Sequence, residues 1–427
     1  MEQHEVVITG LGLISSLGKS AEINWEEVLK GHTGLAPVPA LDEIEKPIYG
    51  GQVKEASLPD DLSPKIMNQS KFLNRGGQLG FLAAQEAFQM AAWTESDPPP
   101  RERAMYVATG DMTMVGYDFF YSALKEATGG TFRNIDQIRL NKAAIEKVNP
   151  FYLLESLNNN PFSFLTAIFN FMGPGTSLAS QSPSGSHALE MAYRSIRTGR
   201  STVAMAVGSG SWINEVAFFE LEGLGLLSRG RQGIQSYRPL NAKRDGFLPG
   251  EGGAALILES LAGARARGAR IYGRILGVGN TTQASPRLNV PDQVTLKSME
   301  EALKEGRCHP GDLGFICPHG SGTIKGDRSE MLSLSTLLGP ACEDVPICAL
   351  KAYTGHMGAA SDLGEVILSL LALEQGLVPG TLHFETPEPA FSSLRISNQA
   401  QPCSKARFLS VSYGLGGQAS AVLIESQ

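Results

Sequence analysis

The segment Ser182-Pro183-Ser184-Gly185-Ser186-His187 decides the fold of this chain. A short apolar segment, 176–179, leads into it, and a strongly apolar helical segment, 188–196, follows it. This order predicts a strand, a tight elbow and a helix, with the Ser182 hydroxyl at the elbow. Ser followed by Pro is also a common helix start, with Ser as N-cap and Pro at the first helical position. The hydroxyl is therefore expected either to cap this helix or to react with, or contact, a substrate.

Two later segments each place a His on a glycine-rich turn. They are Pro318-His319-Gly320 and Lys351-Ala352-Tyr353-Thr354-Gly355-His356. We expect both imidazoles and the Lys351 ammonium to converge on the Ser182 hydroxyl. The alternative for each His is a buried imidazole with satisfied hydrogen bonds, and Lys351 could instead pair with Glu330 or Glu365.

Short β-branched runs alternate with helical segments along the chain, which is typical of an α/β protein. Strands are predicted at 5–9, 104–108, 177–179, 202–207, 254–258, 271–278, 315–317, 346–349, 408–412 and 419–424. Helices are predicted at 21–30, 79–92, 184–198, 296–305, 327–338 and 361–375. Gly199 and Gly376 stand where left-handed glycines would end two of these helices.

The order of elements occurs twice. In each half a strand leads to a Ser/Thr-Gly-His type turn, an apolar helix, a glycine, a strand and a glycine-rich segment. The repeat predicts two α/β halves, 1–260 and 261–427. The aromatic-rich segment 111–160 breaks the alternation, and we expect it to be a cap over a pocket, a dimer contact or ordinary surface.

Composition limits the function. The net charge is −7 and the isoelectric point near 5.6, which argues against nucleic acid or an anionic membrane as an obligatory partner. The apolar run 366–373 is too short to span a bilayer, and no secretory signal is visible. Five cysteines without a C-x-x-C pair predict no metal site and a reducing, cytoplasmic location.

Several motifs taken together resemble those of one enzyme family. They are Arg238-Pro239, Arg244-Asp245-Gly246-Phe247, Gly250-Glu251-Gly252, His319-Gly320-Ser321-Gly322-Thr323, the segment 351–356 and Gly414-Leu415-Gly416-Gly417. Their order and spacing resemble the β-ketoacyl-acyl-carrier-protein synthases of the type II kind, in the thiolase-like superfamily. The resemblance covers the whole chain and implies a thiolase fold with two pseudo-symmetric α/β halves in a layered αβαβα arrangement.

The resemblance also implies roles for individual residues. Ser182 stands where the family carries its nucleophilic Cys, and His319 and His356 would promote decarboxylation of a bound malonyl group, with Lys351 orienting the site. Further roles follow by position. The backbone N–H groups of Ser182 and Leu415 would form an oxyanion hole. Ser321, Thr323 and Gly416 would contact the substrate, whose phosphopantetheine arm is delivered by an acyl carrier protein, so that no other cofactor is expected.

Departures from the family pattern bear on the chemistry. A Cys thiol at a helix N-terminus ionises without a base, whereas a Ser hydroxyl needs a base beside it. His319 or His356 could serve as that base. Leu415 replaces the usual Phe gate, and Pro239-Leu240-Asn241 replaces a commoner Pro-Trp-Asp. Ordinary condensation should therefore be slow or absent, while decarboxylation, which depends on the two His residues, could persist.

Three functions stay open on this basis. The first is an enzyme of a type II fatty-acid or polyketide pathway that decarboxylates malonyl units or transfers acyl groups on carrier-protein thioesters. The second is a non-catalytic subunit, like a chain length factor, that pairs with a Cys-containing ketosynthase. The third is a synthase that condenses through Ser182. All three predict a dimer, either a homodimer or a heterodimer.

Overall fold

The computed structural model describes residues 4–38, 48–59, 62–93, 98–110, 118–148, 152, 157–179, 182–283 and 290–427. Within these ranges the main strands are β1 (Val6–Ile14), β4 (Arg103–Thr109), β5 (Gly175–Ala179), β6 (Val203–Ser211), β7 (Glu251–Ser260), β8 (Gly273–Thr282), β9 (Phe315–Cys317), β12 (Arg407–Tyr413) and β13 (Gln418–Ser426). Two small ribbons pair β2 (Ala36–Val38) with β3 (Ile48–Gly50) and β10 (Leu377–Val378) with β11 (Gln401–Pro402).

The main strands join in one sheet, in the order β5-β4-β6-β7-β1-β8-β13-β12-β9. The pairs β4–β5, β4–β6 and β9–β12 are parallel, and the other pairs are antiparallel. Strand β1 pairs with β8 only over Val6–Ile8, so this short contact joins the N-terminal strands to the C-terminal ones.

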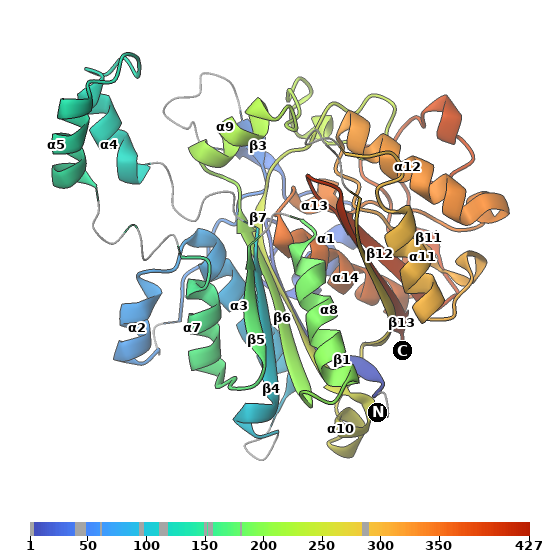
Figure 1. The fold of residues 1–427 in the computed structure, drawn as a ribbon. Coiled ribbons are helices and arrows are strands. Elements are labelled where there is room, and N and C mark those ends of the chain that lie inside the picture. The colour runs from blue at the N-terminus through green and yellow to red at the C-terminus, as the bar shows by residue number, and fades with distance from the viewer. Residues whose placement is uncertain are drawn as a thin grey trace.

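Helices cover both faces of each half of the sheet (Figure 1). The α-helices are α1 (Ala21–Leu29), α2 (Pro64–Ser70), α3 (Arg75–Ala91), α4 (Asp118–Ala127), α5 (Gln137–Lys147), α7 (Asn160–Phe169), α8 (Ser184–Arg197), α9 (Glu215–Gly223), α10 (Leu261–Ala266), α11 (Leu296–Glu305), α12 (Ile324–Leu338), α13 (Lys351–Thr354) and α14 (Ala359–Glu374). Short 3₁₀ turns span Pro100–Glu102, Gly233–Ser236, Pro310–Asp312, Gly339–Glu343 and Pro389–Phe391.

The central layer consists of α8 and α14. Helix α8 packs on β4, β6 and β13, and α14 packs on β6, β7 and β12, so both lie between the two halves of the sheet. Helices α3 and α7 cover the outer face of the N-terminal strands, while α11 covers that of the C-terminal strands. The layers therefore run α, β, α, β, α, as the family resemblance implied.

Burial explains why these two helices occupy the middle. Almost every residue of α14 is buried, from Ala359 to Ala372, and a helix that is apolar on all sides must be enclosed by protein. Both central helices end as predicted, because Gly199 and Gly376 follow them with φ of 72° and 66°.

Most predicted elements are confirmed to within a few residues, and the helix predicted at 296–305 coincides with α11. The strand predicted at 346–349 is wrong. Ile347 forms only isolated bridges to Ile316 and Ile396, because the chain turns into α13 at Lys351 before a ladder can grow.

The capping interpretation of Ser182 is also wrong. Helix α8 begins at Ser184 with Pro183 as its N-cap residue, and no side chain caps it. Because Ser182 lies one residue earlier, its hydroxyl does not satisfy the first amides of the helix.

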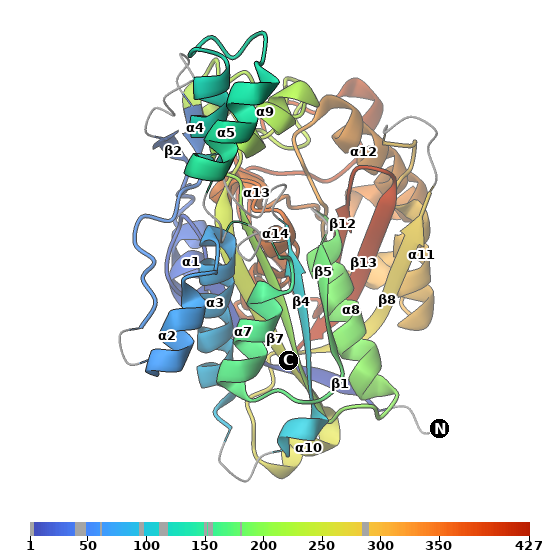
Figure 2. The ribbon, with the colours of Figure 1, turned by 60° about the vertical axis from the view of Figure 1, so that its left-hand side comes forward.

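Residues 118–148 of the predicted insertion form a hairpin of α4 and α5. Figures 1 and 2 both show this hairpin at the end of the molecule that carries α9, and Figure 1 shows it standing away from the sheet. Ile138 and Ile145 are 83% and 86% exposed on it. The rest of the segment falls largely outside the described residues, so a cap or dimer contact there stays a prediction.

Candidate active site

One cavity collects the predicted site residues. Ser182, His319 and His356 all line it, together with Leu415. Its volume is about 50 Å³, room for a few water molecules. The other lining residues are Trp212, Leu221, Leu226, Phe247, Val290, Ser321, Thr323, Tyr413 and Gly414. The structure thus brings together side chains that lie far apart in the sequence, as predicted.

The elbow at Ser182 is fixed by close backbone packing. A Cβ atom added to Gly414 would lie 1.7 Å from the Ser182 carbonyl oxygen, so only glycine fits there. Gly414 follows β12, which runs beside β9 in the C-terminal half. The glycine-rich segment after β12 therefore packs directly against the backbone of Ser182.

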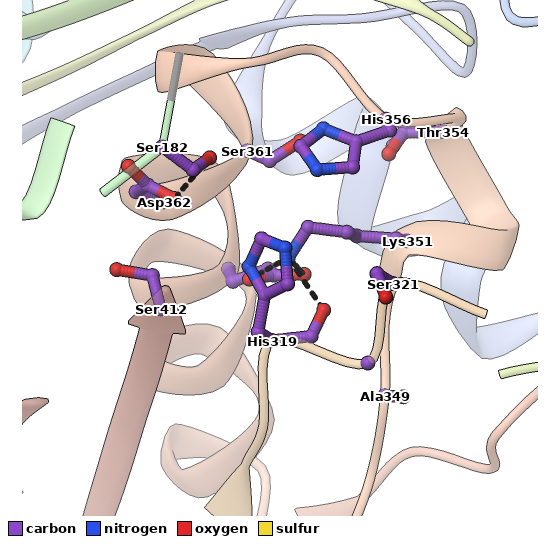
Figure 3. A network of polar contacts seen from close by, with 12 residues as sticks. Ser182, His319, Ser321, Ala349, Lys351, Thr354, His356, Ser361, Asp362 and Ser412 are labelled. Carbon is purple, nitrogen blue, oxygen red and sulfur yellow. Dashed lines mark hydrogen bonds and ion pairs between the residues drawn. The ribbon is translucent and has the colours of Figure 1, made fainter. Parts of the chain in front are cut away.

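The hydroxyl of Ser182 is hydrogen bonded to a carboxylate. Ser182 Oγ donates to Asp362 Oδ1 at 3.3 Å, and Gly185 N donates to Asp362 Oδ2 at 3.0 Å. Ser182 is 5% exposed and Asp362 is 1% exposed. Figure 3 shows this pair beside the two imidazoles. Within the described part of the chain, the hydroxyl bonds to Asp362 and not to either His.

Burial raises the pKa of Asp362 to about 7. The Lys351 ammonium, the backbone amides of Ser186 and Gly185 and the Ser182 hydroxyl all oppose this shift. Asp362 also lies in the first turn of α14, while Gly185 lies in the first turn of α8. Positive helix ends on both sides therefore stabilise its anion against the cost of burial.

His356 is held by backbone and by aromatic rings. Its ring stacks on Trp212 with centroids 4.6 Å apart and lies 4.9 Å from the Phe247 ring. Gly358 N donates to its Nδ1 at 3.2 Å. Because Nδ1 accepts this bond, the neutral ring carries its proton on Nε2 and can donate it.

His319 follows β9 and is fixed through its backbone. Glu330 accepts hydrogen bonds from His319 N at 2.7 Å and from Gly320 N at 2.8 Å. Its ring lies 5.1 Å from the His356 ring, centroid to centroid. Among the described residues nothing hydrogen bonds to His319 Nδ1. His319 is therefore not the satisfied core imidazole that was the alternative expectation.

Both imidazoles are neutral near pH 7. Burial lowers the pKa of His319 and of His356 well below the ordinary value, and the nearby positive charge of Lys351 adds to this effect. A neutral imidazole has one N–H to donate and no charge of its own. The cavity therefore offers two uncharged donors side by side.

Lys351 lies outside the cavity and fixes the backbone that carries His319. Its Nζ donates to the His319 carbonyl oxygen at 2.7 Å and to both Glu365 carboxylate oxygens at 2.8 and 2.9 Å. These three bonds use the whole ammonium, and Lys351 does not line the cavity. Lys351 therefore fixes the His319 turn, and its carboxylate partner is Glu365, not Glu330.

Ser321 and Thr323 both line the cavity, but the Ser321 hydroxyl is already occupied. It donates to Asp327 Oδ1 at 3.0 Å and lies 3.1 Å from the Tyr413 phenol oxygen and 2.8 Å from Thr323 Oγ1. Thr323 is half-buried and sits nearer solvent. Contact of a substrate arm with Ser321, Thr323 or Gly416, and donation by the Ser182 and Leu415 amides, stay predictions.

Two site residues were missed by the sequence analysis. Asp362 is an acidic residue inside an apolar helix, which was a signal that its carboxylate is buried for a reason. Tyr413 precedes Gly414, and its ring lies 4.4 Å from that of His319. Its phenol fits only because Gly326 has no side chain, since an added Cβ would lie 2.1 Å from the phenol oxygen.

A larger hollow lies elsewhere. It measures about 700 Å³ and is lined by Lys19 and Ser20 just before α1, by residues of α3 and by the segment 55–57, including Glu55 and Glu86. Its lining holds neither His nor Cys. We place the chemistry at the smaller cavity because the reactive side chains converge there.

Two kinds of feature are absent from the described residues. None of the helices there is long and apolar enough to cross a bilayer. No group of three or more His, Cys, Asp or Glu side chains in the same residues could hold a metal ion.

The layers define an α/β protein of the thiolase fold. Solved structures agree: a type II polyketide synthase acyl-carrier protein in complex with its ketosynthase matches at a TM-score of 0.85 with 24% identity over 100% of both chains. The ishigamide ketosynthase/chain length factor matches at 0.85 with 23% identity, also over 100% of both chains.

The family follows from the sequence matches. Residues 3–264 match the β-ketoacyl synthase N-terminal domain, and residues 272–385 match the C-terminal domain. The 3-oxoacyl-[acyl-carrier-protein] synthase 2 of Staphylococcus aureus (strain N315) is 26% identical over 99% of this chain and 98% of its own. The chain therefore belongs to the β-ketoacyl synthase family.

Proposed function

We propose that this chain decarboxylates malonyl groups carried as thioesters on an acyl carrier protein. The observation that carries the proposal is the His pair: two neutral imidazoles, 5.1 Å apart, in one cavity beside Ser182. Decarboxylation needs donors at the thioester oxygen and no nucleophile. These two side chains supply such donors.

In the proposed step the thioester oxygen accepts N–H hydrogen bonds from His356 and His319. The bond between the α-carbon and the malonyl carboxylate breaks, and its electron pair forms an enolate while carbon dioxide leaves. Donors aimed at a developing oxyanion in a buried site typically contribute about 10²–10³-fold each. The enolate then takes a proton from solvent and gives an acetyl thioester.

Neutral imidazoles suit this step better than charged ones. A protonated His would be costly to bury and would be adjacent to Lys351, whose charge already disfavours it. The Lys351–Glu365 pair fixes the His319 carbonyl and with it the turn that aims the ring. The site is thus organised before substrate arrives.

The carrier protein is proposed as the source of the substrate on the strength of relatives. The Staphylococcus aureus relative is named for acyl-carrier-protein substrates, and one structural neighbour was solved with its carrier protein. Thr323, half-buried at the cavity, is the side chain we assign to the incoming arm. Ser321 instead fixes the network of Asp327 and Tyr413.

Ordinary condensation is not part of the proposal. It requires a reactive nucleophile that stores an acyl chain, and a Ser hydroxyl does not ionise as the thiol of a Cys does.

The test is direct. Purified chain is incubated with malonyl-loaded carrier protein, and the carrier is followed by intact-protein mass spectrometry. The proposal predicts acetyl-carrier protein, formed in proportion to the amount of chain and abolished by heating it. If the malonyl carrier persists unchanged at equimolar chain, decarboxylation is not the function.

A second function, a partner subunit like a chain length factor, is favoured by two observations. The α4–α5 hairpin exposes Ile138 and Ile145 almost fully, and a structural neighbour is a ketosynthase/chain length factor. This function predicts a stable heterodimer with a Cys-containing ketosynthase and no acetyl product from the chain alone. Co-expression followed by size-exclusion chromatography separates it from a homogeneous homodimer.

A further inference from the structure

We infer that Ser182 and Asp362 form a nucleophile–base pair that takes a short acyl group from a thioester and holds it as a serine ester. The inference rests on the proposed function for its substrate class, an acyl thioester on a pantetheine arm. It assigns to Asp362 a role that the His pair was expected to fill.

The geometry gives the hydroxyl one proton acceptor. Ser182 Oγ donates to Asp362 Oδ1 at 3.3 Å, while no imidazole of the described residues accepts from it. A Ser nucleophile is weak unless a base stands within hydrogen-bond reach. The two imidazoles instead lie edge to face, with 5.1 Å between their centroids.

The carboxylate itself is held in place. Its other oxygen accepts from Gly185 N at 3.0 Å, so the group is clamped to the first turn of α8. Asp362 also belongs to the first turn of α14 and is 1% exposed. An oriented, water-excluded carboxylate between two helix N-termini resembles the arrangement in which general bases work.

The buried position of Asp362 makes its carboxylate a stronger base. Burial raises the pKa of Asp362 to about 7, whereas an ordinary Asp at about 3.9 is a far weaker base. A base is most effective when its pKa lies near the working pH. A carboxylate needed only to hold a hydroxyl would gain nothing from such a shift.

The step balances without any further reactant. The Ser182 proton passes to Asp362 as Oγ bonds to the thioester carbonyl carbon. The carbon–sulfur bond then breaks, and the leaving thiolate takes the proton from Asp362. The products are an ester at Ser182 and a free pantetheine thiol, and the reverse sequence returns the acyl group to a second thiol.

The cavity limits which acyl group fits. Beyond the polar groups its described lining is apolar, with Leu221, Leu226 and Phe247, and its volume is about 50 Å³. We therefore assign a short acyl group, of the acetyl class.

The experiment follows the ester on the whole chain. Acetyl-loaded carrier protein and, separately, the acetyl thioester of free pantetheine are incubated with wild type, Asp362→Asn, Ser182→Ala and the exposed control Asp344→Asn. Intact mass and peptide mapping locate the adduct. We expect an acetyl ester on Ser182 in wild type and Asp344→Asn, none in Ser182→Ala, and a rate about 10²–10⁴-fold lower in Asp362→Asn.

Two results would overturn the inference: wild type that stays free of adduct with both donors, or Asp362→Asn that acylates as fast as wild type. Thermal unfolding of Asp362→Asn, and of Asp362→Ala as a second variant, shows that the loss is not misfolding. Malonyl decarboxylation is measured on the same samples to distinguish the proposed decarboxylation from the acylation of Ser182. Decarboxylation without an ester refutes only this inference, and an ester without decarboxylation refutes only the proposed function.

Discussion

The Nζ atom of Lys351 lies 2.7 Å from the carbonyl oxygen of His319, and the same ammonium binds both carboxylate oxygens of Glu365. Lys351 is 1% exposed, so this charge is paired entirely within protein. The turn that presents His319 is therefore tied to α14 by one buried ion pair.

Replacing Lys351 by Met should damage both stability and activity. The change leaves the Glu365 carboxylate buried without its partner, a loss that typically costs about 3–5 kcal/mol. Chemical denaturation should show this decrease, and decarboxylation should fall because the His319 turn loses its donor. Lys405→Met is the control, since Lys405 also donates to a carbonyl oxygen but at the surface.

The double variant Lys351→Met with Glu365→Gln separates the two effects. Removing the stranded charge should restore much of the stability while decarboxylation stays low. Full recovery of activity in the double variant would show that Lys351 does not position His319.

Gly414→Ala should disrupt the elbow. Its new Cβ would lie 1.7 Å from the Ser182 carbonyl oxygen, where only backbone movement could relieve the clash. We expect a loss of about 1–3 kcal/mol in denaturant unfolding, with reduced chemistry at Ser182. Gly223→Ala is the matched control because nothing lies within 4 Å of its added Cβ. Equal stability of the two variants would contradict the packing described here.

The two proposed reactions should differ in their pH dependence. Acylation of Ser182 needs ionised Asp362, whose pKa is about 7, so its rate should rise with pH, reach half its maximum near pH 7 and level off about one unit higher. Decarboxylation needs neutral imidazoles, whose pKa values lie well below 6.5, so its rate should stay flat from about pH 6 to about pH 8. The other charged groups that act on Asp362 are Lys351 and Glu365, and the imidazoles of His319 and His356 lie in the same site (Figure 3).

Both rates can be measured on one sample by quenching the reaction at successive times and analysing the protein by mass spectrometry, at pH values from about 6 to about 8. The Asp362→Asn variant should lose the rise near pH 7. An acylation rate that does not change with pH would show that Asp362 is not the base in this step.

The thiol of a Ser182→Cys variant should react slowly with iodoacetamide. A neighbouring carboxylate disfavours a second negative charge and raises the thiol pKa, although the start of α8 favours the thiolate. Adding Asp362→Asn should remove the repulsion and speed alkylation by iodoacetamide at pH 7 by about tenfold or more. If Ser182→Cys and the double variant Ser182→Cys with Asp362→Asn react equally fast, Asp362 carries no negative charge next to residue 182.

The sequence predicted the individual strands and helices well because they depend on local patterns, whereas their layered arrangement was implied by the family resemblance. Alternating apolar segments and helix-ending glycines such as Gly199 and Gly376 report directly on strands and helix ends. The strand at 346–349 could not be predicted correctly, because its pairing depends on where neighbouring loops place Ile316 and Ile396.

The site was predictable only in part. His319, His356 and Lys351 could be predicted because they lie in glycine-rich turns with the spacing of the family motifs. The partner of Ser182 does not, because Asp362 is 180 residues away in sequence and meets it only when α8 and α14 pack together. The saturation of the Ser321 hydroxyl by Asp327 and Tyr413 likewise depends on tertiary packing.

The most direct test is the initial rate at which acetyl-carrier protein forms from malonyl-carrier protein at pH 7. Wild type, His319→Ala, His356→Ala and the exposed-residue control His309→Ala are compared at equal, folded concentrations. The account predicts product from wild type and His309→Ala, and rates at least about 10²-fold lower in the two cavity variants. Equal rates in all four proteins, or no product from wild type, would contradict it.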